Sequence, residues 1–296
     1  MNKSLAVHLA LFAVAVIYGV NYTVAKGVMP QYLGASGFVL IRIGVAALLF
    51  NVVAIFSRKK EKIQSKKDYG QLLIAATFGV AGNMLLFFNG LAHTTEINAS
   101  VLMQNAPIFV LIFSFFLYKK PVSKQQVAGI LIAAAGAILL IGGTKFQFGG
   151  ETVKGDIMVT LNAISFAMYL VYVTRLLEKY STLFVIRHLF VFGFFLALPF
   201  GLADIVSADY SNFPSSIWIS IGYVAILTTF VAYLLNAWAV QRATPALVSS
   251  YIYLQPVVAI FVAVNTVNQS LSLEKIIFAG VIFTGVYLVS FNKKQA

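Results

Sequence analysis

Ten long apolar runs occupy most of this 296-residue chain and limit what it can fold into. Each run has about 20 residues, the length that an α-helix needs to cross the roughly 30 Å hydrocarbon layer of a bilayer. The sequence therefore predicts an all-α integral membrane protein with ten transmembrane helices. These helices are expected at residues 6–29, 34–56, 69–92, 97–118, 124–143, 155–176, 182–203, 214–238, 245–267 and 273–291.

The composition supports this class and excludes others. Only 10% of the residues are charged, whereas an average soluble chain carries about 25%. A disordered chain and an ordinary cytosolic enzyme are excluded on this ground. The sequence contains no cysteine, and His8, His93 and His188 are scattered along it, so neither a metal site nor a cofactor is expected.

The basic residues between the runs indicate how the chain is oriented. Counting on alternate sides places fifteen lysines and arginines on one side of the membrane and three on the other. Because basic residues concentrate in cytoplasmic loops, both termini are expected in the cytoplasm. This topology accounts for the net charge of +12, and no nucleic-acid partner is needed to explain it.

The second half of the sequence repeats the first. A shift of 149 residues superposes the third to fifth runs on the eighth to tenth without a gap, so that Pro107 falls on Pro256. The first runs align at a shift of 148 and the second at 145, which places Arg42 on Arg187. Two five-helix units are therefore expected, at residues 1–145 and 146–296. Because five is odd, the second unit enters the membrane from the opposite face, and the two units are inverted.

Inverted repeats of this kind are typical of secondary transporters. In such proteins the substrate site lies near the middle of the membrane between the halves, and rocking of one half exposes it to each side in turn. A scaffold or a channel built by the same duplication is an alternative. A membrane-embedded enzyme is another, but the sequence shows no paired catalytic carboxylates, Ser-His-Asp set or phosphate-binding loop, so no enzymatic activity is expected.

Polar and aromatic side chains recur on single faces of several expected helices, since residues three, four and seven apart share a face. Exposing such groups to lipid is costly, so they should face the bundle interior or a wet cavity. For any one residue, bonding between helices and contact with substrate are alternative roles. The candidate cavity residues are Tyr18, Asn21, Tyr22, Asn83, Gln104, Asn105, Tyr169, Tyr172, Tyr233, Asn236, Ser249, Tyr253 and Gln255.

Pro107 and Pro256 occupy matched positions in the two repeats. Each removes a backbone donor and is expected to bend its helix. We expect these kinks to line the cavity, where a freed carbonyl or the bend itself would serve transport. Kinks that face lipid are the alternative.

Two basic residues of the first repeat fall within expected spans. Lys26 lies close to the outer end of its helix, where its side chain can extend to the membrane surface. Arg42 lies deeper, about two turns from the outer end, and needs a carbonyl or anionic partner. It is expected either to bond neighbouring helix ends or, like Lys26, to provide positive potential for a substrate carboxylate or phosphate. No Asp or Glu lies at mid-depth, so ion coupling through a buried carboxylate is disfavoured.

Small residues recur every four positions at Gly129, Ala133 and Ala137. Such a stripe allows two helices to approach closely, either within one chain or between protomers. A monomer and a homodimer are therefore both compatible with the sequence.

A set of short motifs, in their order and spacing, resembles the EamA-type ten-helix family of the drug/metabolite transporter superfamily. The motifs are Tyr18–Tyr22, Arg42 and Arg187, Asn89–Leu91, Gln104–Pro107, Leu254–Pro256, and the glycines Gly129, Gly136 and Gly285. Where the usual first-helix pattern begins with Trp-Gly, this chain has Tyr18-Gly19.

The resemblance implies a central cavity lined by helices one, three, four, six, eight and nine. It also implies movement of small organic metabolites, commonly outward, with amino acids, nucleotide sugars or sugar phosphates as substrates of known relatives. We therefore expect an exporter of amino-acid-like or other small polar or aromatic solutes, embedded in the lipid bilayer of a bacterial inner membrane.

Overall fold

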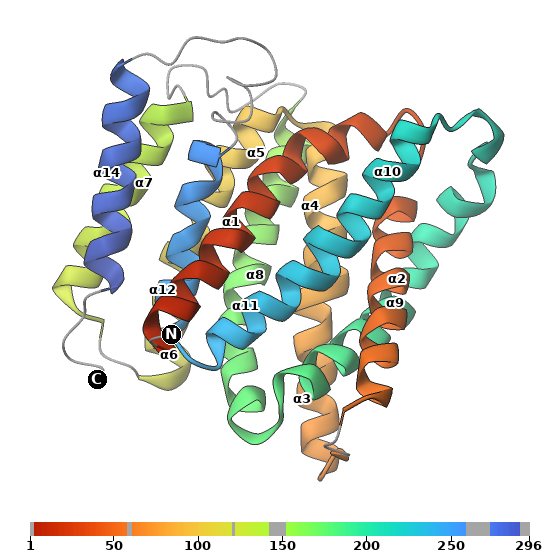
Figure 1. The fold of residues 1–296 in the computed structure, drawn as a ribbon, viewed down its shortest axis with the longest axis horizontal. Coiled ribbons are helices and arrows are strands. Elements are labelled where there is room, and N and C mark those ends of the chain that lie inside the picture. The colour runs from red at the N-terminus through yellow and green to blue at the C-terminus, as the bar shows by residue number, and fades with distance from the viewer. Residues whose placement is uncertain (1–2, 58–60, 120–121, 142–151, 259–272, 291–296) are drawn as a thin grey trace.

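The computed structural model describes residues 3–57, 61–119, 122–141, 152–258 and 273–290, which form helices joined by turns and short irregular segments (Figure 1). The first half contains α1 (Lys3–Val28), α2 (Ala35–Ile55), α3 (Lys66–Ala76), η1 (Thr77–Ala81), α4 (Gly82–His93), α5 (Glu96–Met103), α6 (Ala106–Tyr118) and α7 (Lys124–Ile141). The second half contains α8 (Val153–Lys179), α9 (Thr182–Ser207), η4 (Tyr210–Asn212), α10 (Ser215–Tyr223), η5 (Val224–Val231), α11 (Ala232–Val240), α12 (Pro245–Ser250), η6 (Tyr251–Leu254) and α14 (Leu273–Ser290).

Seven helical segments in the described ranges are long and apolar enough to cross a membrane. The apolar stretches of α7 and α14 are shorter than these seven segments. The all-helical class predicted from the sequence is confirmed, and these apolar segments agree with an integral membrane protein. The expected helix at 245–267 is described only as far as residue 258, so its second part lies outside the described residues.

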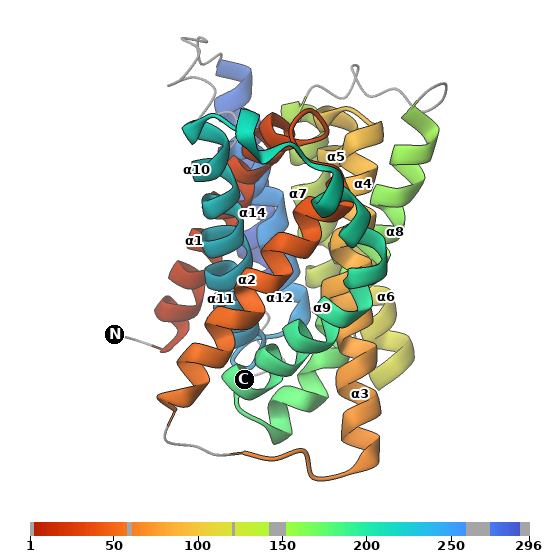
Figure 2. The same ribbon diagram turned by 90° about the vertical axis from the view of Figure 1, so that its right-hand side faces the viewer.

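The helices run up and down between two ends of one bundle. α1 begins and α14 ends in its lower half in Figure 1, and Figure 2 shows α3 beginning at the same end. The opposite end holds the end of α1, the beginning of α2 and the turn between α4 and α5. There, Asp204 of α9 accepts a hydrogen bond from the amide of Gly37 at 2.9 Å. A carboxylate at this position stabilises the positive end of the α2 dipole.

The two halves share an irregularity in their third long helix. η1 is a π-helical segment between α3 and α4, and η5 is one between α10 and α11. The shift of 149 residues that aligns the two halves places η1 within the range of η5, so the two π segments occupy matching positions. π segments are rare, and they insert an extra residue into a helix, frequently at functional sites.

The helix that follows also begins in the same way in both halves. Thr95 caps the start of α5 by accepting from the amide of Asn98 at 3.0 Å. Thr244, which is 149 residues later, caps α12 by accepting from the amide of Leu247 at 3.2 Å. The hydroxyl of an N-cap threonine satisfies an amide that has no partner within the helix.

Both prolines follow helix breaks. α5 ends at Met103, and α6 begins at Ala106 with Pro107 in its first turn. In the second half, the α-helix gives way to 3₁₀ geometry over η6, which ends two residues before Pro256. Proline is tolerated in the first turn of a helix because the amide there has no helical partner. The bends expected at the prolines therefore lie just upstream of them, as interruptions of the helix.

The small-residue stripe of α7 packs against α14 of the same chain (Figure 1). A Cβ on Gly285 would lie 2.5 Å from the carbonyl oxygen of Gly129, so only glycine allows this approach. Ala133 and Ala137 are fully buried in the same cluster. Of the two roles open to this stripe, the structure shows the one within the chain.

Candidate functional site

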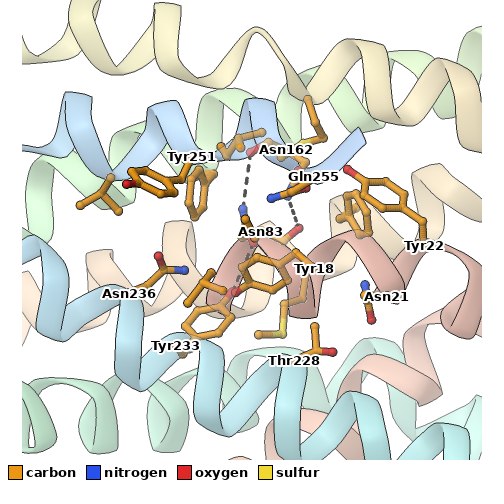
Figure 3. Close-up of a pocket in the computed structure, with 18 of the residues that line it drawn as sticks. Tyr18, Asn21, Tyr22, Asn83, Asn162, Thr228, Tyr233, Asn236, Tyr251 and Gln255 are labelled. Atoms are coloured by element: carbon orange, nitrogen blue, oxygen red, sulfur yellow. Dashed lines mark hydrogen bonds between the residues drawn. The ribbon is translucent and has the colours of Figure 1, made fainter. Parts of the chain in front are cut away.

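A cavity of about 90 Å³ lies among helices from both halves of the chain (Figure 3). Because one water molecule needs roughly 10–15 Å³ of such space, the cavity has room for several. Aromatic and aliphatic side chains form much of its wall, among them Phe87, Phe88 and Phe166. Its polar lining consists of Tyr18, Asn21, Tyr22, Arg42, Asn83, Asn162, Thr228, Tyr233, Asn236, Tyr251 and Gln255.

Seven of the thirteen candidate residues line this cavity. α1 contributes Tyr18, Asn21 and Tyr22, and α4 contributes Asn83. The second half contributes Tyr233 and Asn236 from α11, and Gln255 directly after η6. α2 also reaches the cavity, through Arg42, although the resemblance did not place the second helix in the lining.

The other six candidate residues do not line it. They are Gln104, Asn105, Tyr169, Tyr172, Ser249 and Tyr253. Asn105 donates to the carbonyl of Leu102 at 3.0 Å, and Ser249 donates to that of Ala246 at 3.1 Å, so both bond within their own segment. Tyr253 is fully buried in a separate apolar cluster that includes Ala15 and Ile130.

Helix breaks account for where two of these residues, Gln104 and Tyr253, lie. The sequence prediction assumed that residues three, four and seven apart share a face through the whole of the fourth and ninth helices. α5 ends before Gln104, and η6 turns with 3₁₀ geometry, so the face changes at both places. Tyr169 lies in an unbroken helix but packs over η1, where a Cβ on Gly79 would come within 2.2 Å of its ring.

Hydrogen bonds join three of the helices around the cavity. The side-chain amide of Asn162 in α8 donates to the carbonyl of Asn83 in α4 at 2.7 Å. The hydroxyl of Tyr233 in α11 donates to the carbonyl of Gly79 at 3.0 Å. Figure 3 shows these side chains pointing toward one another. These bonds hold part of the polar wall in a fixed arrangement.

Other polar atoms of the wall have no partner among the residues described. They are Asn21 Oδ1, Arg42 Nη1, Asn162 Oδ1 and Thr228 Oγ1. A buried polar group without a hydrogen bond costs about 1–3 kcal/mol, and such groups are few in native proteins. Their concentration around one cavity means that a polar solute or water there would gain bonds that the protein does not provide for itself.

Arg42 carries the only formal charge in the described lining of the cavity. Its Nε donates to the hydroxyl of Thr229 at 2.8 Å, and its guanidinium lies 4.4 Å from the centre of the Phe88 ring. Lys26, in contrast, does not line the cavity. Its ammonium group donates to the carbonyl of Thr94 at 3.1 Å and joins the end of α1 to the turn between α4 and α5.

A second polar cluster, which the sequence did not reveal, lies beside that turn. Asp156, near the beginning of α8, is fully buried. Its carboxylate accepts from Thr94 at 2.5 Å, from Asn98 at 3.1 Å and from Thr152 at 2.9 Å. From sequence, Asp156 is one of several acids near a helix end, and the residues that surround it lie up to 62 positions away.

Comparison with known proteins decides the family. The model of the EamA-like transporter family matches residues 5–142 and, separately, residues 153–291. The chain belongs to the EamA-like transporter family. It is therefore a member of the drug/metabolite transporter superfamily, as its motifs indicated.

Curated relatives of this EamA-family chain carry transporter names. Uncharacterized transporter YyaM of Bacillus subtilis is 25% identical over 97% of this chain and 94% of its own length. Uncharacterized transporter YetK of the same organism is 24% identical over the whole chain and 90% of the relative. Uncharacterized inner membrane transporter YedA of Escherichia coli is 26% identical over 96% of this chain and 90% of the relative. Together with the family, these names support a membrane transporter and do not point to an enzyme.

A solved crystal structure shares the fold of this EamA-family chain. The two superpose with a TM-score of 0.77 over 95% of each chain, at 18% sequence identity. At this identity the likeness concerns the fold alone.

Proposed function

We propose that this protein is a secondary transporter that exports small organic solutes across the bacterial cytoplasmic membrane by alternating access. The observation that carries the proposal is the cavity between the two halves, whose wall holds four buried polar atoms without a partner in the described structure. A solute bound there would contact residues of both halves. Tyr18, Asn21, Asn83, Tyr233, Asn236 and Gln255 are the proposed contacts.

The ten helices form two inverted five-helix repeats, at residues 1–145 and 146–296. The matched π segments and the matched threonine caps support this arrangement, because independent helices would have no reason to share such features at one spacing. Separate matches of the family model to residues 5–142 and 153–291 support it as well. Inverted repeats provide two related conformations, one open to each side.

A contact near each end of the bundle has one of its two partners at an equivalent place in the repeats. At the upper end in Figure 1, Asp156 of α8 accepts from Asn98 of α5. The shift of 148 residues that aligns the first helices carries His8 onto Asp156. At the lower end, His8 of α1 shares a hydrogen bond of 2.6 Å with Tyr251 at the start of η6. Opening the cavity to either side requires breaking one of these two contacts.

The principal alternative is a channel or facilitator, and counterflow separates it from a carrier. Purified protein is first screened by thermal shift against amino acids, nucleotides and sugar phosphates, because a ligand that binds the folded state stabilises it. Liposomes that contain the protein and a high concentration of the best ligand are then diluted into a trace of the labelled compound. A carrier accumulates the label transiently above equilibrium, whereas a pore only equilibrates it.

Asn21 and Ser211 provide a matched pair for this assay. Asn21→Ala removes a cavity side chain and should reduce counterflow, whereas Ser211→Ala changes an exposed residue of η4 and should not. Equal counterflow in both variants would contradict the assigned cavity, and equilibration without overshoot would favour the channel. Export is tested in cells, where overproduction should lower the internal concentration of the same compound.

A further inference from the structure

The charge of Arg42 is buried without a counter-ion in the described part of the structure. The side chain is 3% exposed. The carboxylates of Asp68, Asp156 and Asp204 accept hydrogen bonds from other groups, and no described acid lines the cavity. The one ion pair that the described residues form joins Lys179 and Asp68. Desolvating a charge costs several kcal/mol when no opposite charge offsets it.

Neutral groups hold the guanidinium in place and leave the donor Nη1 free. Thr229 accepts from Nε and donates its own proton to the carbonyl of Val224 at 2.7 Å, within η5. Phe88 covers the guanidinium at 4.4 Å from its ring centre. Nη1 is buried and has no partner among the described residues. The π segment thus positions Thr229. Thr229 and Phe88 in turn position Arg42, whose Nη1 remains a free donor.

A guanidinium with a free donor nitrogen is suited to a particular ligand chemistry. Its planar donors match the oxygens of a carboxylate or phosphate, and such charge-assisted bonds are about twice as strong as neutral ones. The other polar residues that line the cavity, such as Asn21 and Thr228, are neutral, so none of them competes with an anionic ligand for the guanidinium. The cavity is therefore electrostatically positive and is lined by hydrogen-bonding groups.

We propose that the transported solute carries an anionic oxygen group, a carboxylate or a phosphate, and that Arg42 binds this group. This inference rests on the proposed transport function and names the substrate class. Arg187, the counterpart of Arg42 in the second repeat, is partly exposed and does not line the cavity, so the two arginines have different roles.

Matched pairs of ligands test the proposal with purified full-length protein. Leucine is compared with leucinamide, benzoate with benzamide, and glucose 6-phosphate with glucose, by thermal shift and by titration calorimetry. Only the member of each pair that carries a carboxylate or phosphate should stabilise the wild-type protein, and the pairs distinguish carboxylate from phosphate. Arg42→Gln should weaken binding of the responding anion on the order of 10- to 100-fold, as expected for a bond to a charged group, while Arg187→Gln should leave it unchanged.

Two further variants keep the test valid if Arg42→Gln does not fold. Arg42→Lys keeps the charge but loses the planar fork and should retain part of the affinity. Thr229→Val removes the acceptor that orients Nε and should also weaken anion binding. A wild-type protein that responds to no anionic member, or equally to both members of a pair, would overturn the proposal. So would undiminished binding in Arg42→Gln.

Counterflow distinguishes failure of this inference from failure of the proposed function. If a neutral solute is carried and Arg42→Gln carries it equally well, the protein is a transporter and the anion inference is wrong. If anions bind through Arg42 but none shows counterflow, the site is correct and the transport proposal is wrong.

Discussion

Nδ1 of His8 lies 2.6 Å from the hydroxyl of Tyr251, which joins α1 of the first half to η6 of the second. Tyr251 also lines the cavity, and His8 lies in the first part of α1, which begins in the lower half of the bundle in Figure 1. In the proposed alternating-access cycle, we expect this bond to break when the cavity opens to that end.

Tyr251→Phe should therefore favour the conformation open to the cytoplasm. A single hydrogen bond contributes about 0.5–1.5 kcal/mol, so this conformation should become a few-fold more populated. Because the chain has no cysteine, Leu11→Cys introduces a unique thiol in the cavity wall. In inverted membrane vesicles, whose outer surface is the cytoplasmic face, this thiol should be alkylated faster by a similar factor when Tyr251→Phe is also present. Tyr287→Phe, at an exposed tyrosine of α14, is the control, and an equal rate in both backgrounds would argue against this role for Tyr251.

Asp156→Asn should destabilise the folded protein. The carboxylate accepts bonds from Thr94, Asn98 and Thr152, and an amide replaces one of its two acceptor oxygens with a donor. Loss of one bond to a charged group costs about 1.5–3 kcal/mol, which should lower the thermal midpoint in detergent by several degrees. Asp209→Asn, at an exposed turn, should change it little. A midpoint lowered equally by both substitutions would contradict the special position of Asp156.

Gly285→Val should destabilise the packing of α7 on α14. Its Cβ would come within 2.5 Å of the backbone of both Gly129 and Ala133, and a backbone cannot move aside as a flexible side chain can. Overpacking of this kind typically costs about 1–3 kcal/mol or more. Gly280→Val lies on the same helix, where a Cβ meets nothing within 4 Å, and should be tolerated. Thermal midpoints of the two variants in one detergent provide the measurement, and similar values would show that this contact does not hold the helices together.

Labelling of single cysteines should show which end of the bundle faces the cytoplasm. Gln31 is exposed between α1 and α2, and Gln64 is exposed before α3, at the opposite end. By the positive-inside rule, a membrane-impermeant maleimide should label Gln31→Cys in intact cells and Gln64→Cys only after lysis. The reverse pattern would invert the expected topology.

Some of the candidate site follows directly from the sequence. Residues of α1 lie in one continuous helix, so the spacing of Tyr18, Asn21 and Tyr22 predicted a shared region of wall, and all three line the cavity. Gln104 and Tyr253 do not lie on the cavity wall, because each residue of an α-helix turns the chain by about 100° and the helix is interrupted beside both. Interruptions of this kind depend on packing as well as on the local residues.

By itself, the sequence determined the all-helical class and the family, because apolar runs of membrane-crossing length and ordered short motifs are local properties of the chain. Only the tertiary structure decided which polar residues share a cavity, and why Arg42 reaches it while Arg187 does not. It also surrounded Asp156 with donors from distant segments. These relationships join residues tens to hundreds of positions apart, and they depend on how the helices pack, which the periodicity of one helix does not encode.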